Sequence, residues 1–148
     1  NSCIYGPRQF GVEDQGWLAW FVIAALKDKD LTIYGNGKQV RDVLHVSDLI
    51  NAMLLAASNE KAYGQVYNMG GGPENSISVW REFKPMLDSL LGRDVMAKYG
   101  PWRPGDQKIY ISDTARAREE LGWEPEITVE EGVRNLHRWV SRNLDLIG

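Results

Sequence analysis

The feature that most constrains the fold of this chain is an apolar run from Trp17 to Lys27. It is apolar on nearly every face of a helix, and such a helix is usually buried or covered by a partner. The stretch from Trp17 to Leu26 is too short to cross a lipid bilayer. We expect a helix here, with Trp17, Trp20, Phe21 and Leu26 in the core; ligand contacts or a dimer or tetramer surface are the alternatives.

Short strands alternate with helices along the rest of the chain. Strands are predicted at residues 2–5, 31–34, 43–46 and 66–69, from their β-branched and aromatic content. Helices are predicted at 48–57 with Ser47 as N-cap, at 78–91 with Ser78 as N-cap and a kink at Pro85, at 113–121 closed by Gly122, and from a capping box at Thr128 and Glu131. This order favours an α/β lobe over a helix bundle or a β-sandwich.

Length and charge exclude several classes. The chain has 148 residues, which suits one domain, and its net charge of −3 gives no broad attraction to nucleic acid or an anionic membrane. Cys3 is the only cysteine, which fits a reducing compartment such as the cytoplasm. No signal peptide or membrane span is predicted. The chain opens at Asn1, in what reads as a strand end, so we expect an excised piece of a longer protein.

The usual catalytic patterns are missing from this sequence. The histidines, at 45 and 137, lie far apart, and no spacing resembles a metal site or a nucleophile with its base. The glycines at 70–72 follow a predicted strand but lack the spaced pattern of a dinucleotide site, so a simple turn is expected there. Tyr34 and Lys38 match a Tyr-x-x-x-Lys spacing, but Gly35 and Gly37 lie between them and disfavour a helix.

Anion recognition is the chemistry that remains. Arg41 follows a strand and a glycine turn, and a guanidinium fixed in this way can grip a diphosphate with paired hydrogen bonds. Asp42 could hold it in place. Arg103 sits on a second turn, Arg103-Pro-Gly-Asp106, and the start of the apolar helix adds free backbone N–H groups. Each arginine taken alone could equally be a solvated surface charge.

A set of motifs resembles one known family. Tyr5-Gly-Pro-Arg-Gln9, the stretch from Tyr34 to Asp48, and Tyr67-Asn-Met-Gly-Gly71 resemble the extended short-chain dehydrogenases/reductases. Arg103 to Asp106, Ser112-Asp113 and Leu121-Gly-Trp-Glu-Pro125 complete the set. The resemblance implies a Rossmann half that binds NAD and a smaller C-terminal lobe that binds a nucleotide sugar. Residues 1–148 would be that substrate-binding lobe plus the last elements of the Rossmann-type half.

The resemblance also assigns roles by position. Arg41 and Arg103 are expected to clamp the diphosphate, and Asp106 to hold a ribose hydroxyl or orient Arg103. The remaining substrate-binding residues are expected to be Thr32, Ile33 and Tyr34 beside the base and Gln15, Gly16 and Trp17 near the phosphates. Ser2 and Cys3 are expected to contact the cofactor; many family members have asparagine at the position of Cys3, and packing is its alternative role.

The stretch from Arg8 to Phe21 looks most like the CDP-sugar 2-epimerases of this family. The expected function is binding of a CDP-linked sugar in an NAD-dependent, homo-oligomeric epimerase. The catalytic Tyr-x-x-x-Lys pair would lie upstream, so the isolated piece is expected to be inactive. The alternatives are a 4-epimerase or 4,6-dehydratase acting on a UDP- or dTDP-sugar, and a non-catalytic nucleotide-sugar-binding module.

Overall fold

Parallel strand pairing organises the molecule, and a computed structural model describes all 148 residues. Strand β3 (Val40–His45) is the centre of one sheet. Its second half pairs in parallel with β1 (Cys3–Tyr5); its first half pairs antiparallel with β4 (Ser76–Ser78) and in parallel with β6 (Ile109–Tyr110). A separate parallel pair joins β2 (Thr32–Tyr34) to β5 (Lys98–Gly100). The predicted α/β class is confirmed.

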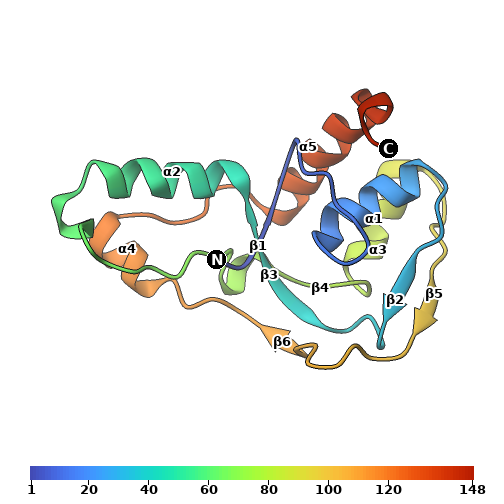
Figure 1. Ribbon diagram of the computed structural model, residues 1–148, viewed down its shortest axis with the longest axis horizontal. Helices are drawn as coiled ribbons and strands as arrows, with labels where there is room; N and C mark the ends of the chain where they lie inside the picture. Colours follow the sequence, from blue (N-terminus) through green and yellow to red (C-terminus); the bar gives the residue numbers. More distant parts are fainter.

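Three helices gather at one end of the molecule, which we call the body: α1 (Trp17–Leu26), α3 (Phe83–Leu91) and α5 (Val129–Arg142). Figure 1 shows α1 and α3 at the same end of the molecule as β2 and β5. Helix α5 contacts both other helices, and 20 buried apolar residues form one cluster here. Burial of this much apolar surface is the main stabilising term of the fold.

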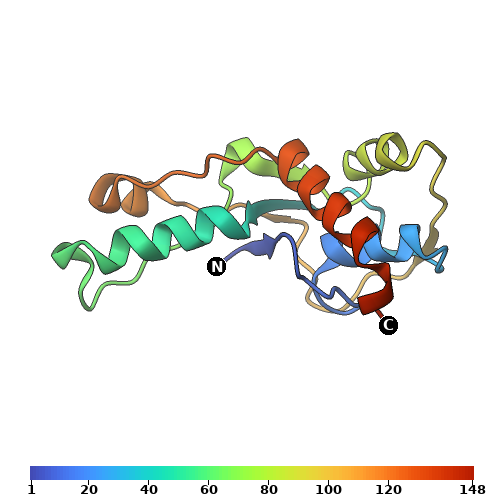
Figure 2. The same ribbon diagram turned by 90° about the horizontal axis from the view of Figure 1, so that it is seen from above.

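Two further helices form a narrow extension, which we call the arm: α2 (Val46–Ala57) and α4 (Ala115–Leu121), with residues 58–70 between them. Figure 2 shows α2 and α4 side by side, pointing away from the body. Their cluster holds only six buried residues: Leu44, Ala52, Met69, Ala117, Leu121 and Trp123. Short 3₁₀ turns occupy Glu60–Ala62, Pro73–Asn75 and Leu144–Leu146.

Helix α1 is buried over most of its length, but only one of the four residues predicted for the core is fully buried. Seven of its ten residues are buried. Phe21 belongs to the core, whereas Trp17, Trp20 and Leu26 are half-buried and pack against it. The helix therefore supplies the centre of the body, and none of the molecule's helices combines the length and apolar character needed to cross a membrane.

The predicted strand at 66–69 is wrong. This segment forms no ladder, and its one backbone bond to another segment runs from the amide of Ser2, just before β1, to the carbonyl of Met69, at 2.8 Å. A strand requires a ladder of backbone hydrogen bonds to a neighbouring strand, and a single bond does not make one. Val66 is consequently 80% exposed despite its β-favouring side chain.

Three predicted helix starts also differ from the structure; α4 begins at Ala115, two residues after the predicted start. Ser78 ends β4, and α3 begins five residues later at Phe83, which places Pro85 in the first turn, where its missing N–H costs nothing. Helix α2 begins at Val46, with the ring Nδ1 of His45 accepting from the amide of Ser47. The cap at Thr128 is confirmed, since its side chain accepts from the amide of Glu131.

Candidate functional site

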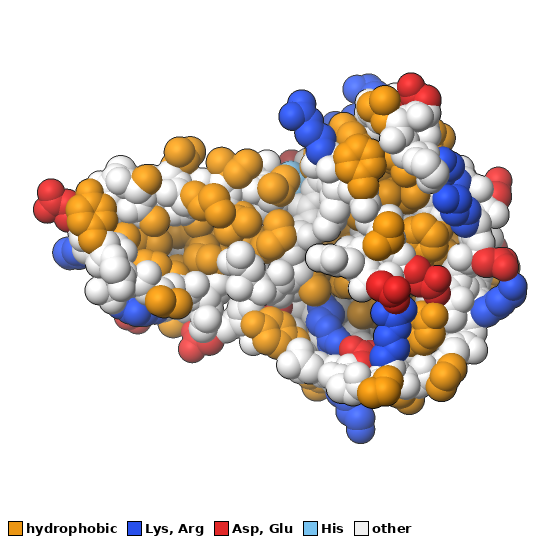
Figure 3. All heavy atoms as spheres, in the orientation of Figure 1, with side chains coloured by type: hydrophobic (Ala, Val, Ile, Leu, Met, Phe, Trp, Pro, Cys, Tyr) orange, Lys and Arg blue, Asp and Glu red, His pale blue; other side chains and the backbone are white.

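The predicted substrate-binding residues converge on one pocket of the body. It has a volume of about 200 Å³ and lies among the start of α1, strand β2, the start of β3 and the turn at 103–106. All nine predicted residues line it: Gln15, Gly16, Trp17, Thr32, Ile33, Tyr34, Arg41, Arg103 and Asp106. Figure 3 shows acidic and basic side chains gathered on this face between β6 and β2. The structure shows that these residues lie together; their role in binding stays a prediction.

Arg41 projects from β3 into this pocket with its guanidinium already held. One nitrogen pairs with Asp106 Oδ1 at 2.7 Å, and another donates to the carbonyl of Val40 at 2.8 Å. The side chain of Arg41 is only 13% exposed. Burial and two fixed partners restrict the rotamers of Arg41, so its remaining N–H donors point in defined directions.

Asp42 does not hold Arg41, so that expectation is wrong. Neighbouring residues of a strand point to opposite faces, and Asp42 turns inward, fully buried. Its carboxylate accepts from the amides of Gly72 and Ser112, each at 3.1 Å, and from the hydroxyl of Ser2. Asp42 therefore ties three segments together beneath the site.

Arg103 is held differently. Its guanidinium carbon lies 3.9 Å from the ring centroid of Tyr34, a cation–π contact. One nitrogen also pairs with Asp14 at 3.0 Å and approaches the carbonyl of Glu13 at 3.4 Å. Tyr34 in turn donates its hydroxyl to Glu13 at 2.8 Å. Because Asp106 pairs with Arg41, it does not orient Arg103.

Glu13 and Asp14 form an acidic tip that was missing from the predicted site. They lie between Val12 and Gln15, whose backbones bond to each other at 2.9 and 3.0 Å in a tight turn. The pocket is thus lined by three carboxylates and two guanidinium groups. Two consecutive acids just before a predicted helix start were the available signal for this tip.

The start of α1 faces the same pocket. Gly16, its N-cap, adopts a left-handed conformation with φ of 75°, and no side chain caps the helix. No acidic residue lies in the first turn. The first backbone N–H groups are therefore left for water or a ligand, at the positive end of the helix dipole.

Ser2 and Cys3 lie outside this pocket. The hydroxyl of Ser2 is bound to Asp42, and burial raises the pKa of the half-buried Cys3 thiol. The glycine run at 70–72 is packed against β3, since a side chain at Gly71 would overlap the carbonyl of Val43. The cofactor role of Ser2 and Cys3 stays a prediction.

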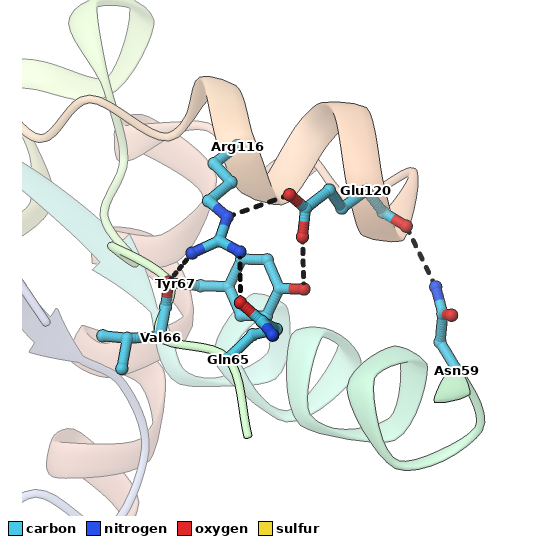
Figure 4. A network of polar contacts seen from close by, with 6 residues as sticks. All are labelled: Asn59, Gln65, Val66, Tyr67, Arg116 and Glu120. Atoms are coloured by element: carbon cyan, nitrogen blue, oxygen red, sulfur yellow. Dashed lines mark hydrogen bonds and ion pairs between the residues drawn. The ribbon is translucent and has the colours of Figure 1, made fainter. Parts of the chain in front are cut away.

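A second arginine network lies in the arm. Figure 4 shows Arg116 donating to Glu120 at 2.9 Å, to the carbonyl of Val66 at 3.1 Å and to Gln65 at 2.5 Å. Its guanidinium lies 5.1 Å from the ring centroid of Tyr67, whose hydroxyl donates to Glu120 at 2.7 Å. This network fastens α4 to the segment before Met69, and each of the three guanidinium nitrogens of Arg116 already has a partner.

Known proteins share this fold and these motifs. The family model described as GDP-mannose 4,6 dehydratase matches residues 4–136. The chain belongs to the extended short-chain dehydrogenase/reductase family. Within this family, the CDP-paratose 2-epimerase of Salmonella typhi is 37% identical over 147 residues, which cover 95% of this chain and 43% of that protein.

Two solved structures of the family superpose closely on the chain. The UDP-glucose 4-epimerase of Thermotoga maritima, solved with UDP-glucose, matches with a TM-score of 0.85 and 33% identity, over 97% of this chain and 45% of its own. The dTDP-glucose 4,6-dehydratase of Bacillus anthracis, solved with NAD, matches with a TM-score of 0.80 and 30% identity, over 99% and 44% respectively. The chain thus spans less than half the length of these relatives.

Proposed function

We propose that this chain is the nucleotide-sugar-binding part of an NAD-dependent CDP-sugar 2-epimerase that converts CDP-paratose to CDP-tyvelose through a 2-keto intermediate. The observation that carries the binding proposal is the convergence of Arg41, Arg103 and the uncapped start of α1 on one pocket. The choice of a CDP-sugar and of C2 is supported by the 37% identity to CDP-paratose 2-epimerase.

The proposed binding mode follows from the free groups of the pocket. The diphosphate lies between Arg41 and Arg103, taking the place of Asp14 at Arg103, with the first N–H groups of α1 as further donors. The cytosine lies along β2, which pairs only with β5 and keeps one edge unpaired. Backbone groups on that edge offer hydrogen bonds to the base.

In this proposal, hydride transfer to and from NAD belongs to the part of the enzyme that the chain does not span. The Tyr-x-x-x-Lys pair would lie there too, since Tyr34 and Lys38 flank a turn in which Gly35 and Gly37 have φ of 84° and 70°. The 148 residues alone are therefore expected to be inactive, and turnover by them would contradict this division.

Isothermal titration of the full-length protein with CDP tests the binding claim. Arg41→Ala should weaken CDP binding roughly ten- to hundredfold, because it removes a charged hydrogen-bonding partner. Glu119→Gln, on the exposed face of α4 outside the pocket, is the matched control and should leave the affinity unchanged. No CDP binding by the wild type, or equal binding by Arg41→Ala, would sink the proposal.

The second candidate is a 4-epimerase or 4,6-dehydratase of a UDP- or dTDP-sugar, favoured by the two structural matches. A coupled assay of the full-length protein with CDP-paratose, UDP-glucose and dTDP-glucose separates the three reactions. Turnover of CDP-paratose supports the 2-epimerase. Nucleotide binding without turnover of any of them would indicate a binding module.

A further inference from the structure

Gln39 is a buried amide in the wall of the pocket, and the predicted substrate-binding residues did not include it. It is 3% exposed, immediately precedes β3, and lies two residues from Arg41. Its Nε2 donates to the carbonyl of Tyr34 at 2.5 Å and to Asp106 Oδ2 at 3.2 Å. The other oxygen of the same carboxylate pairs with Arg41. One side chain thus links β2, β3 and the turn at 103–106.

The orientation of this amide is fixed by its neighbours. Both groups around Nε2 are acceptors, so a flipped amide would set its oxygen against a carbonyl and a carboxylate. The Oε1 atom is left buried without a hydrogen-bond partner. An unpaired buried acceptor is costly, so the two hydrogen bonds of Nε2 have to offset that cost.

The surrounding turn also closes on Gln39. A side chain at Gly35 would come within 2.9 Å of its Nε2 and 2.8 Å of the Trp102 ring. The glycine turn therefore brings the backbone against the amide, which lets the carbonyl of Tyr34 reach it. Gln39 has little freedom to move, and Asp106 is constrained with it.

We propose that Gln39 is a positioning residue for the anion-binding groups of the pocket: it fixes the Asp106 carboxylate, and through it the Arg41 guanidinium. This inference rests on the proposed diphosphate site and extends it to a residue that contacts no phosphate. Without Gln39, Asp106 can rotate, and Arg41 loses the partner that aims its free donors at the ligand.

Titration of the full-length protein with CDP and with cytidine tests this role. Gln39→Met keeps the size of the side chain and removes its hydrogen bonds; it should weaken CDP binding roughly tenfold and leave cytidine binding unchanged. Gln65→Met, the same substitution in the arm, is the control. Equal weakening for CDP and cytidine would indicate a structural role and overturn the inference, as would no weakening at all.

A double-mutant cycle adds a second readout. If Gln39 acts through Asp106, the pair Gln39→Met and Asp106→Asn should lose no more CDP affinity than Asp106→Asn alone; fully additive losses would overturn the inference. If Gln39→Met fails to fold, Gln39→Glu replaces it as the test. This variant sets a second carboxylate beside Asp106, so CDP binding should be weaker at neutral pH and should recover as the pH falls. A loss that does not recover would count against positioning.

The two proposals fail in different ways. A wild type that binds CDP and an Arg41→Ala variant that does not would support the diphosphate site; Gln39→Met matching the wild type in the same titrations would then overturn only the positioning role. A wild type that binds no CDP would overturn both.

Discussion

Two arginines lie over tyrosine rings: Arg103 in the body and Arg116 in the arm. They have the same kinds of neighbour but differ in how fully their guanidinium groups are paired. Arg116 has a glutamate, an amide oxygen and a backbone carbonyl as partners. Arg103 has an exposed aspartate and one long contact to a carbonyl. A stacked, paired arginine is therefore not a binding site by itself. What distinguishes Arg103 is its unused donors and the pocket that it lines.

The body and the arm, which contain these two arginines, also differ in how much apolar surface they bury. The body has 20 buried apolar residues behind its pocket, whereas the arm relies on six. The arm also exposes Ile50, Met53 and Leu54 of α2, at 51%, 59% and 65%, and Figure 3 shows the hydrophobic surface that covers this part. The body can hold a rigid site, while the arm depends on a few large contacts.

The largest expected effect is on the small cluster of the arm. Trp123 is 1% exposed, and its Nε1 donates to the carbonyl of Asp48 at 2.9 Å. Trp123→Ala should lower the free energy of unfolding by about 3–5 kcal/mol, measured by urea denaturation. Hydrogen exchange should speed up mainly in α2 and α4. Equal loss of protection in α1 and α5 would show that arm and body unfold as one unit.

The next effect separates the two arginines directly. Arg103→Ala should weaken CDP binding of the full-length protein roughly tenfold, through the loss of a charged hydrogen-bonding group. Arg116→Ala should leave CDP affinity unchanged and lower the thermal midpoint, because it releases α4 from the segment at 65–67. Titration and thermal unfolding of both variants check this; a reversed pattern would refute the distinction.

A smaller effect concerns the pH dependence of stability at His45, the residue that caps helix α2 of the arm. Burial lowers the pKa of His45, against the opposing influence of Asp48 and Glu131. A histidine with a lowered folded-state pKa favours the neutral form, so stability is complete above its unfolded pKa and falls as pH drops below about 6.5. His45→Asn keeps a capping side chain for α2 and removes the titration.

Urea midpoints at pH 7.5 and 5.5 measure this effect. The wild type should lose stability between the two values, and His45→Asn should lose less. His137 lies on α5, and its pKa is also lowered by burial. His137→Asn therefore measures how much of the pH dependence comes from the body. If His45→Asn keeps the full pH dependence of the wild type, the cap is not the titrating group.

The smallest effect tests the acidic tip. Asp14 is 89% exposed and occupies a donor of Arg103, so Asp14→Asn should tighten CDP binding by up to about fivefold, the range of an exposed ion pair. Glu119→Gln changes the net charge equally without touching the pocket. Titration of both variants separates local competition from overall charge; weaker binding by Asp14→Asn would show that the tip assists the ligand.

The nine predicted residues line one pocket because they belong to motifs whose positions are set by glycine turns and strand ends; their role in binding stays a prediction. Sequence reasoning missed Gln39, Glu13 and Asp14, whose roles depend on which segments meet in space. Assigning Asp42 to Arg41 was avoidable, since adjacent strand residues face opposite ways. The strand predicted at 66–69 failed for another reason: β-propensity of one segment does not tell whether a neighbouring strand lies beside it.

Strand β3 has a consequence for recombination among relatives. Its first half carries Arg41 and pairs with β4 and β6, while its second half carries Leu44, of the arm cluster, and pairs with β1. A hybrid that joins two parent sequences inside residues 40–45 would combine one parent's pocket-facing residues with the other's packing partners. Any gain or loss of one residue at the junction would also exchange the faces of the strand. Functional hybrids should therefore inherit this hexapeptide as a single block.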